Sequence, residues 1–154
     1  MELTEYRYAT LLVSASQSFV KTLQALLPTS VYDPISVRCD AASARRALLE
    51  NRFDIVIVNT PLPDEFGTAL ALDACADSGA GVLLLVRAEL FPQVNEQASP
   101  GGVLTLPKPL SQTLVSQSLT LLRGTRERLR RMEQKTATIE EKMEEIRLVN
   151  RAKW

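Results

Sequence analysis

Five short apolar runs, spaced by roughly 20 residues, limit the possible folds of this chain more than any other feature. They are ATLLV (9–13), ISVRC (35–39), DIVIV (54–58), GVLLLV (81–86) and GVLTL (102–106). The third and fourth runs consist almost entirely of β-branched residues and leucine, which is typical of strands buried on both faces. Helix-like segments lie between the runs. This alternation predicts an α/β fold with a five-stranded parallel sheet and helices on both of its faces.

The intervening segments differ in how strongly they predict a helix. Residues 40–51 begin at Asp40, which is a suitable N-cap. Residues 65–76 follow a turn rich in proline and glycine. The segment 88–98 predicts only a poor helix, because it contains Pro92 and few apolar residues.

The character of the chain changes after Pro109. The segment 111–154 contains no proline, and its apolar residues follow a heptad: Val115, Leu122, Leu129, Met132, Ile139, Met143 and Ile146. This pattern predicts one long helix that forms a coiled coil with a second copy of the chain. In a parallel pair, Arg128 faces Glu133 and Lys135 faces Glu140. Like charges follow at the next pair, so we expect the two-stranded seam to end near residue 142.

The charged residues are unevenly distributed, although the formal net charge is zero. Residues 1–122 carry eight basic and twelve acidic residues, whereas residues 123–154 carry ten and six. The basic stretch 123–135 has two explanations: it contacts nucleic-acid phosphates, or it forms the solvated flank of the coiled coil. The heptad favours the flank, because no aromatic residues for base stacking are interleaved with the cations.

Several classes of protein are disfavoured by the composition. The chain has no histidine, which removes the commonest general base and metal ligand. Its two cysteines, Cys39 and Cys75, sit in no metal or redox motif, so we expect free, buried thiols. No signal peptide or membrane-spanning run is apparent, and we therefore expect a cytoplasmic protein without a membrane partner.

Two motifs resemble those of response-regulator receiver domains. DIVIVNTPLPDEFG (54–67) is similar to the receiver's third strand and the loop after it, with Pro63 and Gly67 at the expected offsets. LPKPL (106–110) is similar to the Lys-Pro motif that ends the fifth strand. The resemblance implies that residues 1–110 adopt the flavodoxin-like (CheY-like) doubly wound sheet, with strand order 2-1-3-4-5.

Most of the phosphotransfer residues of that family are missing here. Receivers use an aspartate to accept a phosphoryl group, two acidic residues to hold Mg²⁺, a Ser or Thr and a Lys to contact the phosphoryl oxygens, and an aromatic switch. The corresponding residues of this chain are Asn59, Ser14, Ala15, Arg87, Lys108 and Thr105. The comparison implies a degenerate phospho-acceptor site in a pseudo-receiver, with no catalytic residue, metal or cofactor.

The altered charge of this site leaves an alternative open. Arg87 and Lys108 face Asn59 without the usual carboxylates, and two unpaired cations repel each other. Arg87 either fills the former metal position or turns outward to Glu89 or Asp64. The alternative function is an anion or metabolite sensor that binds its ligand through Arg87, Lys108 and Asn59.

The end of the chain carries a second resemblance. KTATIEEKMEEIRLVNRAKW (135–154) resembles the start of an ANTAR domain, a helical RNA-binding module of bacterial antiterminators. We therefore divide the chain into a pseudo-receiver (1–110), a fifth helix extended into a coiled coil (111–142) and the start of a truncated ANTAR-like module (143–154). The RNA-contacting helices of that family lie beyond such a start, so either the chain is part of a longer protein or the module has been lost.

Together the two resemblances imply a regulator rather than an enzyme. The expected function is phosphorylation-independent signal transduction and transcription antitermination through RNA binding at or beyond the C-terminal end. The receiver then serves as a dimerisation or docking module. The expected partners are a second copy of the chain, RNA, and a protein at the receiver.

Overall fold

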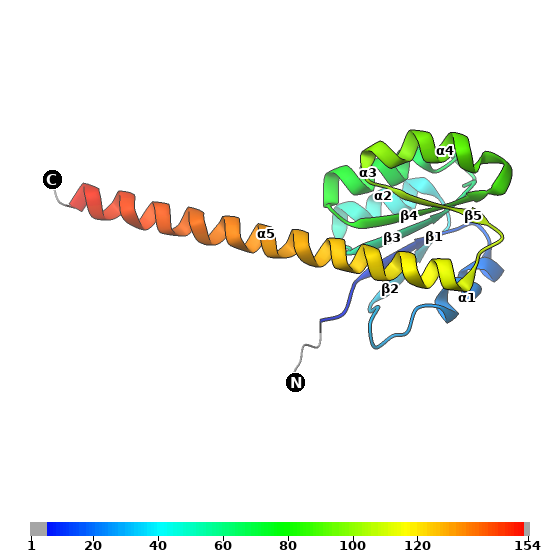
Figure 1. The fold of residues 1–154 in the computed structure, drawn as a ribbon, viewed down its shortest axis with the longest axis horizontal. Helices are drawn as coiled ribbons and strands as arrows, with labels where there is room; N and C mark the ends of the chain where they lie inside the picture. The colour runs from blue at the N-terminus through cyan, green and yellow to red at the C-terminus, as the bar shows by residue number, and fades with distance from the viewer. Residues whose placement is uncertain (1–5, 153–154) are drawn as a thin grey trace.

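Five parallel strands form a single sheet in the computed structural model, which describes residues 6–152 and the side chains of residues 6–147. The strands are β1 (Thr10–Val13), β2 (Ile35–Arg38), β3 (Ile55–Asn59), β4 (Gly81–Arg87) and β5 (Leu104–Lys108). Their spatial order is β2-β1-β3-β4-β5, which confirms the predicted flavodoxin-like topology. Figure 1 shows the sheet within the globular part of the chain and the long last helix projecting from it.

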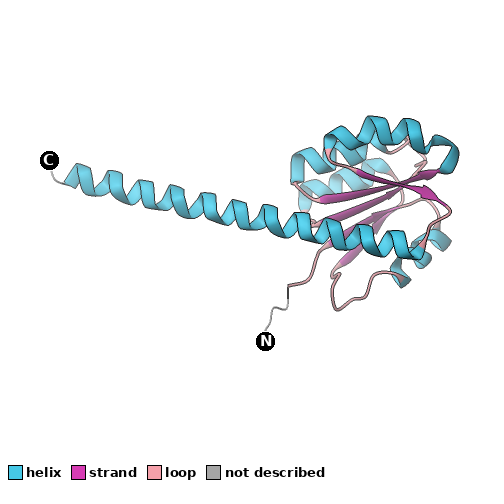
Figure 2. Ribbon diagram, in the orientation of Figure 1, coloured by secondary structure: helices cyan, strands magenta, loops and turns pink. Residues whose placement is uncertain are grey.

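Helices cover both faces of the sheet, as Figure 2 shows. They are α1 (Gln17–Ala25), α2 (Ala41–Glu50), α3 (Thr68–Ser78), α4 (Phe91–Ala98) and α5 (Gln112–Ala152), with short 3-10 turns at Ala88–Leu90 and Ser99–Gly101. The Asp40 carboxylate accepts a hydrogen bond from the backbone N–H of Ser43 at 2.8 Å, so the predicted N-cap of α2 is confirmed.

The expectation of a poor helix over 88–98 is wrong in part, because α4 forms there. Its proline, Pro92, lies in the first helical turn, where no backbone N–H has to be donated within the helix. Val94 and Ala98 on one face of α4 are buried in the core. Two buried residues on so short a helix are too few to give a clear amphipathic pattern in the sequence.

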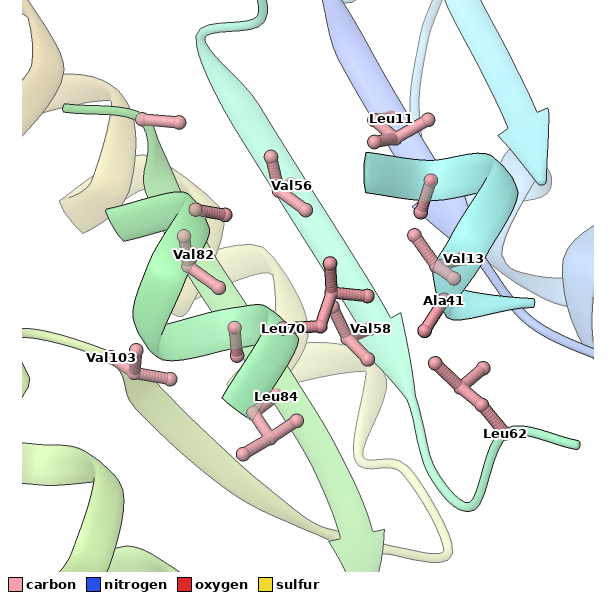
Figure 3. Close-up of a cluster of buried hydrophobic side chains, with 14 of the residues drawn as sticks. Leu11, Val13, Ala41, Val56, Val58, Leu62, Leu70, Val82, Leu84 and Val103 are labelled. Atoms are coloured by element: carbon pink, nitrogen blue, oxygen red, sulfur yellow. The ribbon is translucent and has the colours of Figure 1, made fainter. Parts of the chain in front are cut away.

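Two apolar clusters hold the helices on the sheet. One packs α2, α3 and α4 against alternate residues of the strands, including Val56, Val58 and Val82, and is drawn in Figure 3. The other packs α1 and the start of α5 against the opposite face, through strand residues that include Ile55, Ile57 and Leu83. Because successive strand residues point to opposite faces, the nearly continuous apolar runs in β3 and β4 supply both clusters.

The helix α5 has two different parts. Its first turns carry Val115, Leu119 and Leu122, all of which are buried against the sheet. From residue 131 to residue 147 every side chain is exposed. Its 41 residues correspond to about 61 Å at 1.5 Å per residue, so much of the helix extends beyond the globular domain.

Candidate functional site

The candidate site lies where the strands end at their carboxyl edge. Asn59 ends β3, Lys108 ends β5 and Arg87 ends β4, while Ser14 directly follows β1. The carboxyl ends of parallel strands meet at one edge of the sheet, which is where α/β proteins bind ligands. The structure brings Ser14, Asn59 and Lys108 into hydrogen-bonding contact. Arg87 is the neighbour of Lys108 on the adjacent strand, but its side chain pairs with Glu89.

Hydrogen bonds join Ser14, Asn59 and Lys108 in a series. The Lys108 ammonium donates to Oδ1 of Asn59 at 2.8 Å and to the Thr60 carbonyl oxygen at 2.6 Å. Nδ2 of Asn59 donates in turn to Oγ of Ser14 at 3.0 Å. Because an ammonium can only donate, it fixes which end of the amide faces it. Asn59 and Ser14 are buried, so these contacts replace water as the partners of their polar atoms.

The groups that contact the Lys108 amino group are all uncharged. Burial, and then the positive charge of Arg87, lower the pKa of Lys108. Its nitrogen also lies 5.6 Å from the centre of the Phe19 ring, a distance at which the ring face attracts a cation. The side chain is therefore held by a neutral amide, a backbone carbonyl and an aromatic ring, in place of a carboxylate.

Arg87 turns away from this chain of contacts. Its guanidinium donates to the Glu89 carboxylate at 3.0 Å, and the two side chains are about two-thirds exposed. The backbone N–H of Glu89 and the nearby Arg87 lower the pKa of Glu89. Of the orientations considered from the sequence, the outward turn to Glu89 is the one observed. Arg87 remains the neighbour of Lys108 on the adjacent strand, and its positive charge acts on the lysine.

Asp64 has a separate role at the start of α2. Its carboxylate accepts the backbone N–H groups of Ala41 and Ala42, both at 2.9 Å. These hydrogen bonds lower the pKa of Asp64. The acid is thereby engaged by a helix N-terminus, where a negative charge is stabilised, instead of pairing with Arg87.

The two remaining residues of the degenerate site add no charged group. Ala15 is exposed and apolar. Thr105 is buried on β5, and its hydroxyl has no hydrogen-bond partner among the residues that the structure describes. The residues present therefore do not fit the Mg²⁺ of an active receiver. Magnesium favours anionic oxygen ligands, whereas here the Asn59 oxygen already accepts from a lysine. Within the described residues, no cluster of three metal-ligating side chains is found.

A second polar cluster, which the sequence did not predict, joins α5 to the opposite edge of the sheet. Asp54, just before β3, accepts a hydrogen bond from Nε of Arg126 at 3.0 Å. Its other oxygen accepts from the Tyr6 hydroxyl at 2.8 Å and from the Ala9 N–H at 3.0 Å. Arg126 is only 3% exposed, so this ion pair is buried.

Tyrosines and further arginines surround this ion pair. The Arg130 guanidinium lies 3.8 Å from the centre of the Tyr6 ring, and that of Arg123 lies 5.6 Å from the Tyr32 ring. Partial burial, together with the hydrogen bond to Asp54, raises the pKa of Tyr6 to about 12. Three cations of the basic stretch 123–135 are thus directed at the globular domain, which neither explanation drawn from the sequence anticipated.

The predicted dimer seam must also be corrected at its start. Leu122 was assigned to the seam by the heptad, but it is buried in the domain's own core. Leu129 is half-buried, and a Cβ on Gly79 would lie 3.0 Å from its Cδ2 atom. The other apolar residues of the predicted seam that follow, Met132, Ile139, Met143 and Ile146, are exposed. Residues 148–152 continue the helix, and Lys153 and Trp154 of the ANTAR-like motif lie outside the described residues.

Comparisons with known proteins identify similar folds rather than close relatives. No family model matches the chain. No curated protein sequence matches it either. Solved structures do match, and among them are several receiver domains.

None of the helices in the described part of the chain is long and apolar enough to cross a membrane.

Three of these structures illustrate the likeness. The signal receiver domain of an HD domain-containing protein from Pseudomonas fluorescens Pf-5 has a TM-score of 0.69 and 23% identity, over 87% of this chain and 96% of that one. A protein from Rhodopirellula baltica described as an adenylate cyclase has a TM-score of 0.76 and 18% identity, over 86% and 98%. A CheY-like receiver domain from Methanospirillum hungatei JF-1 has a TM-score of 0.68 and 16% identity, over 80% and 99%. These matches show the CheY-like fold.

Proposed function

We propose that this chain is a receiver-like signalling module that works without phosphoryl transfer and has a regulatory rather than a catalytic role. The observation that carries the proposal is the series of hydrogen bonds from Lys108 through Asn59 to Ser14. These hydrogen bonds engage the two side-chain polar atoms of Asn59 and hold the lysine on a neutral acceptor. A site held in this way has no need of a phosphodonor to reach its working conformation.

The chemistry of the residues supports this proposal. An acyl phosphate forms on a carboxylate, and the residue at this position is an amide whose nitrogen is a hydrogen-bond donor. Ser14 and Ala15 bring no negative charge with which to hold Mg²⁺. The change of one residue would not restore the reaction, because the nucleophile and both metal ligands are absent together.

The anion-sensor alternative finds no favourable observation at this edge of the sheet. The Lys108 amino group already donates to two oxygens of its own chain, and Arg87 is paired with Glu89. An incoming anion would have to compete with these partners.

The proposed module acts as a dimer that forms through α5. Met132, Ile139, Met143 and Ile146 are between about half and two-thirds exposed along a helix that extends from the domain. A long helix with an exposed apolar face is stabilised by a partner rather than by its own propensity. The resemblance of residues 135–154 to an ANTAR domain supports a role in RNA binding and transcription antitermination, with the globular domain free to dock a protein.

Light scattering with and without a phosphodonor tests the proposed module. At tens of micromolar chain, the mass should be that of a dimer, and acetyl phosphate with Mg²⁺ should leave it unchanged. A monomer that becomes a dimer only with the phosphodonor would contradict the proposal.

Binding to RNA hairpins tests the proposed output separately. This chain and a version extended by any natural continuation should be titrated with RNA hairpins and with duplex DNA of equal charge. We expect selective hairpin binding from the form that carries the complete RNA-binding module. If no form prefers hairpins, the antitermination proposal fails while the phosphorylation-independent dimer stands.

A further inference from the structure

The exposed apolar residues of α5 begin within the globular domain and continue along the projecting part. Within residues 112–147, where the side chains of α5 are described, six large apolar side chains are exposed: Leu114, Leu121, Met132, Ile139, Met143 and Ile146. The first two lie beside the sheet, and Leu121 is 60% exposed, similar to Met132 at 62%. We call these six residues the α5 stripe.

The α5 stripe follows one direction along the helix. At about 100° per residue, its six members fall within an arc of about 60°. The side chains that pack on the sheet, including Val115, Leu119 and Leu122, point to a different side, roughly 110° away by the same spacing. The helix therefore has one apolar face for its own domain and a second apolar face that its own domain leaves uncovered.

The spacing within the α5 stripe differs from an unbroken heptad. Leu114 and Leu121 are seven residues apart, Leu121 and Met132 are eleven apart, and Met132 and Ile139 are again seven apart. An eleven-residue step completes three turns at 3.67 residues per turn, close to the straight α-helix, and thus keeps the face aligned. Only the first positions of the predicted heptad, Val115 and Leu122, face the domain instead.

We infer that a second copy of the chain packs in parallel along the α5 stripe from Leu114 to Ile139, so that the two globular domains lie side by side at Leu114 and Leu121. This inference rests on the dimer proposed above and adds where its interface begins. A dimer held by the projecting part alone would leave both leucines uncovered, with the two domains free to separate.

Charge favours a second copy in parallel as the occupant. Lys135 lies on one flank of the α5 stripe, and Glu140 lies on the other. In a parallel pair, Lys135 of each helix faces Glu140 of the other copy, which is the arrangement that favours pairing. Both side chains are exposed.

The globular domain also offers space for a partner's side chain beside Leu121. A hollow of about 390 Å³ lies between α5 and the edge strand β5, and its lining includes Leu104, Leu121 and Leu129. A leucine from the second copy would cover apolar surface there, in addition to meeting its own equivalent across the two-fold axis.

Disulfide cross-linking at single positions tests where the interface begins. In a chain carrying Cys39→Ser and Cys75→Ala, Leu121→Cys places a thiol on the α5 stripe within the domain. Ile139→Cys places one on the projecting part. Thr120→Cys is the matched control, because Thr120 is also exposed but lies about 100° further round the helix.

We expect mild oxidation to convert the Leu121→Cys and Ile139→Cys chains to cross-linked dimers at least tenfold faster than the Thr120→Cys chain. Cross-linking at Ile139→Cys alone would overturn this inference and leave the proposed dimer intact. Equal cross-linking at Thr120→Cys and Leu121→Cys would also overturn it, because random collision would then explain both. If Leu121→Cys and Ile139→Cys both fail to cross-link, the proposed dimer itself is wrong.

Discussion

Replacing Asp54 by asparagine should loosen the joint between α5 and the sheet. Asp54 accepts three hydrogen bonds, from Arg126, Tyr6 and the Ala9 N–H, at 2.8 to 3.0 Å. The substitution keeps the shape of the side chain but removes its charge, which leaves the Arg126 cation 97% buried with no adjacent carboxylate but that of Glu133, at 3.8 Å.

The expected cost follows from these contacts. Breaking a buried ion pair by removing one charge costs about 3–5 kcal/mol. Two effects oppose each other within this range: Glu133 compensates part of the Arg126 charge, whereas the amide nitrogen of asparagine, a donor, must face either Arg126 or the Ala9 N–H. Since whole domains unfold with about 5–15 kcal/mol, such a loss is readily measured.

Urea unfolding followed by circular dichroism, at one fixed chain concentration, gives the free energy of unfolding. The matched control is Asp33→Asn, which removes an exposed ion pair with Arg7 in a hollow that Asp33 and Asp54 both line. The control should cost less than about 1 kcal/mol. Combining Asp54→Asn with Arg126→Met should cost clearly less than the sum of the two single changes, because neither charge then remains buried alone.

Hydrogen exchange shows whether the loss is located at the joint. In the Asp54→Asn chain, amides of α5 from residue 123 onward should exchange faster, while those of β3 and β4 keep their order of protection. If Asp54→Asn costs no more than Asp33→Asn, the ion pair does not hold α5, and our account of the joint is refuted.

Three further predictions concern single side chains. Thr105→Val should leave the free energy of unfolding unchanged or raise it by up to about 1 kcal/mol in a urea titration, because the buried hydroxyl has no hydrogen-bond partner to lose; a clear loss would reveal a partner. Gly124→Ala should raise it by about 0.5–1 kcal/mol, because Gly124 lies inside α5 and an added Cβ meets open space; a loss would mean that the helix needs to bend there. The pKa of Tyr6 is raised to about 12, so the contribution of its protonated hydroxyl to stability is complete below pH 10 and is lost between pH 10 and 12. A Tyr6→Phe chain should lose less stability over this range. Equal losses in the two chains would contradict a raised pKa at Tyr6.

The fold could be predicted from the sequence because its pattern is local. Apolar runs at regular spacing define the strands, and the resemblance in residues 54–67 and 106–110 supplied their order in the sheet. The meeting of Ser14, Asn59 and Lys108 also followed, since residues at the carboxyl ends of parallel strands share one edge. The orientation of Arg87 could not be predicted, because the sequence places two acids, Glu89 and Asp64, within reach of its long side chain and does not distinguish between them.

The joint between α5 and the sheet could not be predicted, because its partners are distant in sequence. Asp54 and Arg126 are separated by 72 positions, and no local period reports such a pair. The heptad wrongly placed Leu122 in the dimer seam. A helical period shows that an apolar residue recurs along α5, but it does not show whether that residue packs on its own domain or is left exposed. Cys39 was expected to be buried and is exposed, which a single cysteine without a motif could not indicate.

The central claim is that the site at Asn59 transfers no phosphoryl group, and intact-mass spectrometry tests it most directly. The chain should be incubated with acetyl phosphate and Mg²⁺ at neutral pH and measured before the acyl phosphate of a known receiver, treated in parallel, has decayed. Our account predicts an unchanged mass for this chain and for its Asn59→Asp variant, because the acidic residues that hold Mg²⁺ are absent from both. A stoichiometric phosphoryl adduct on the unaltered chain would contradict it.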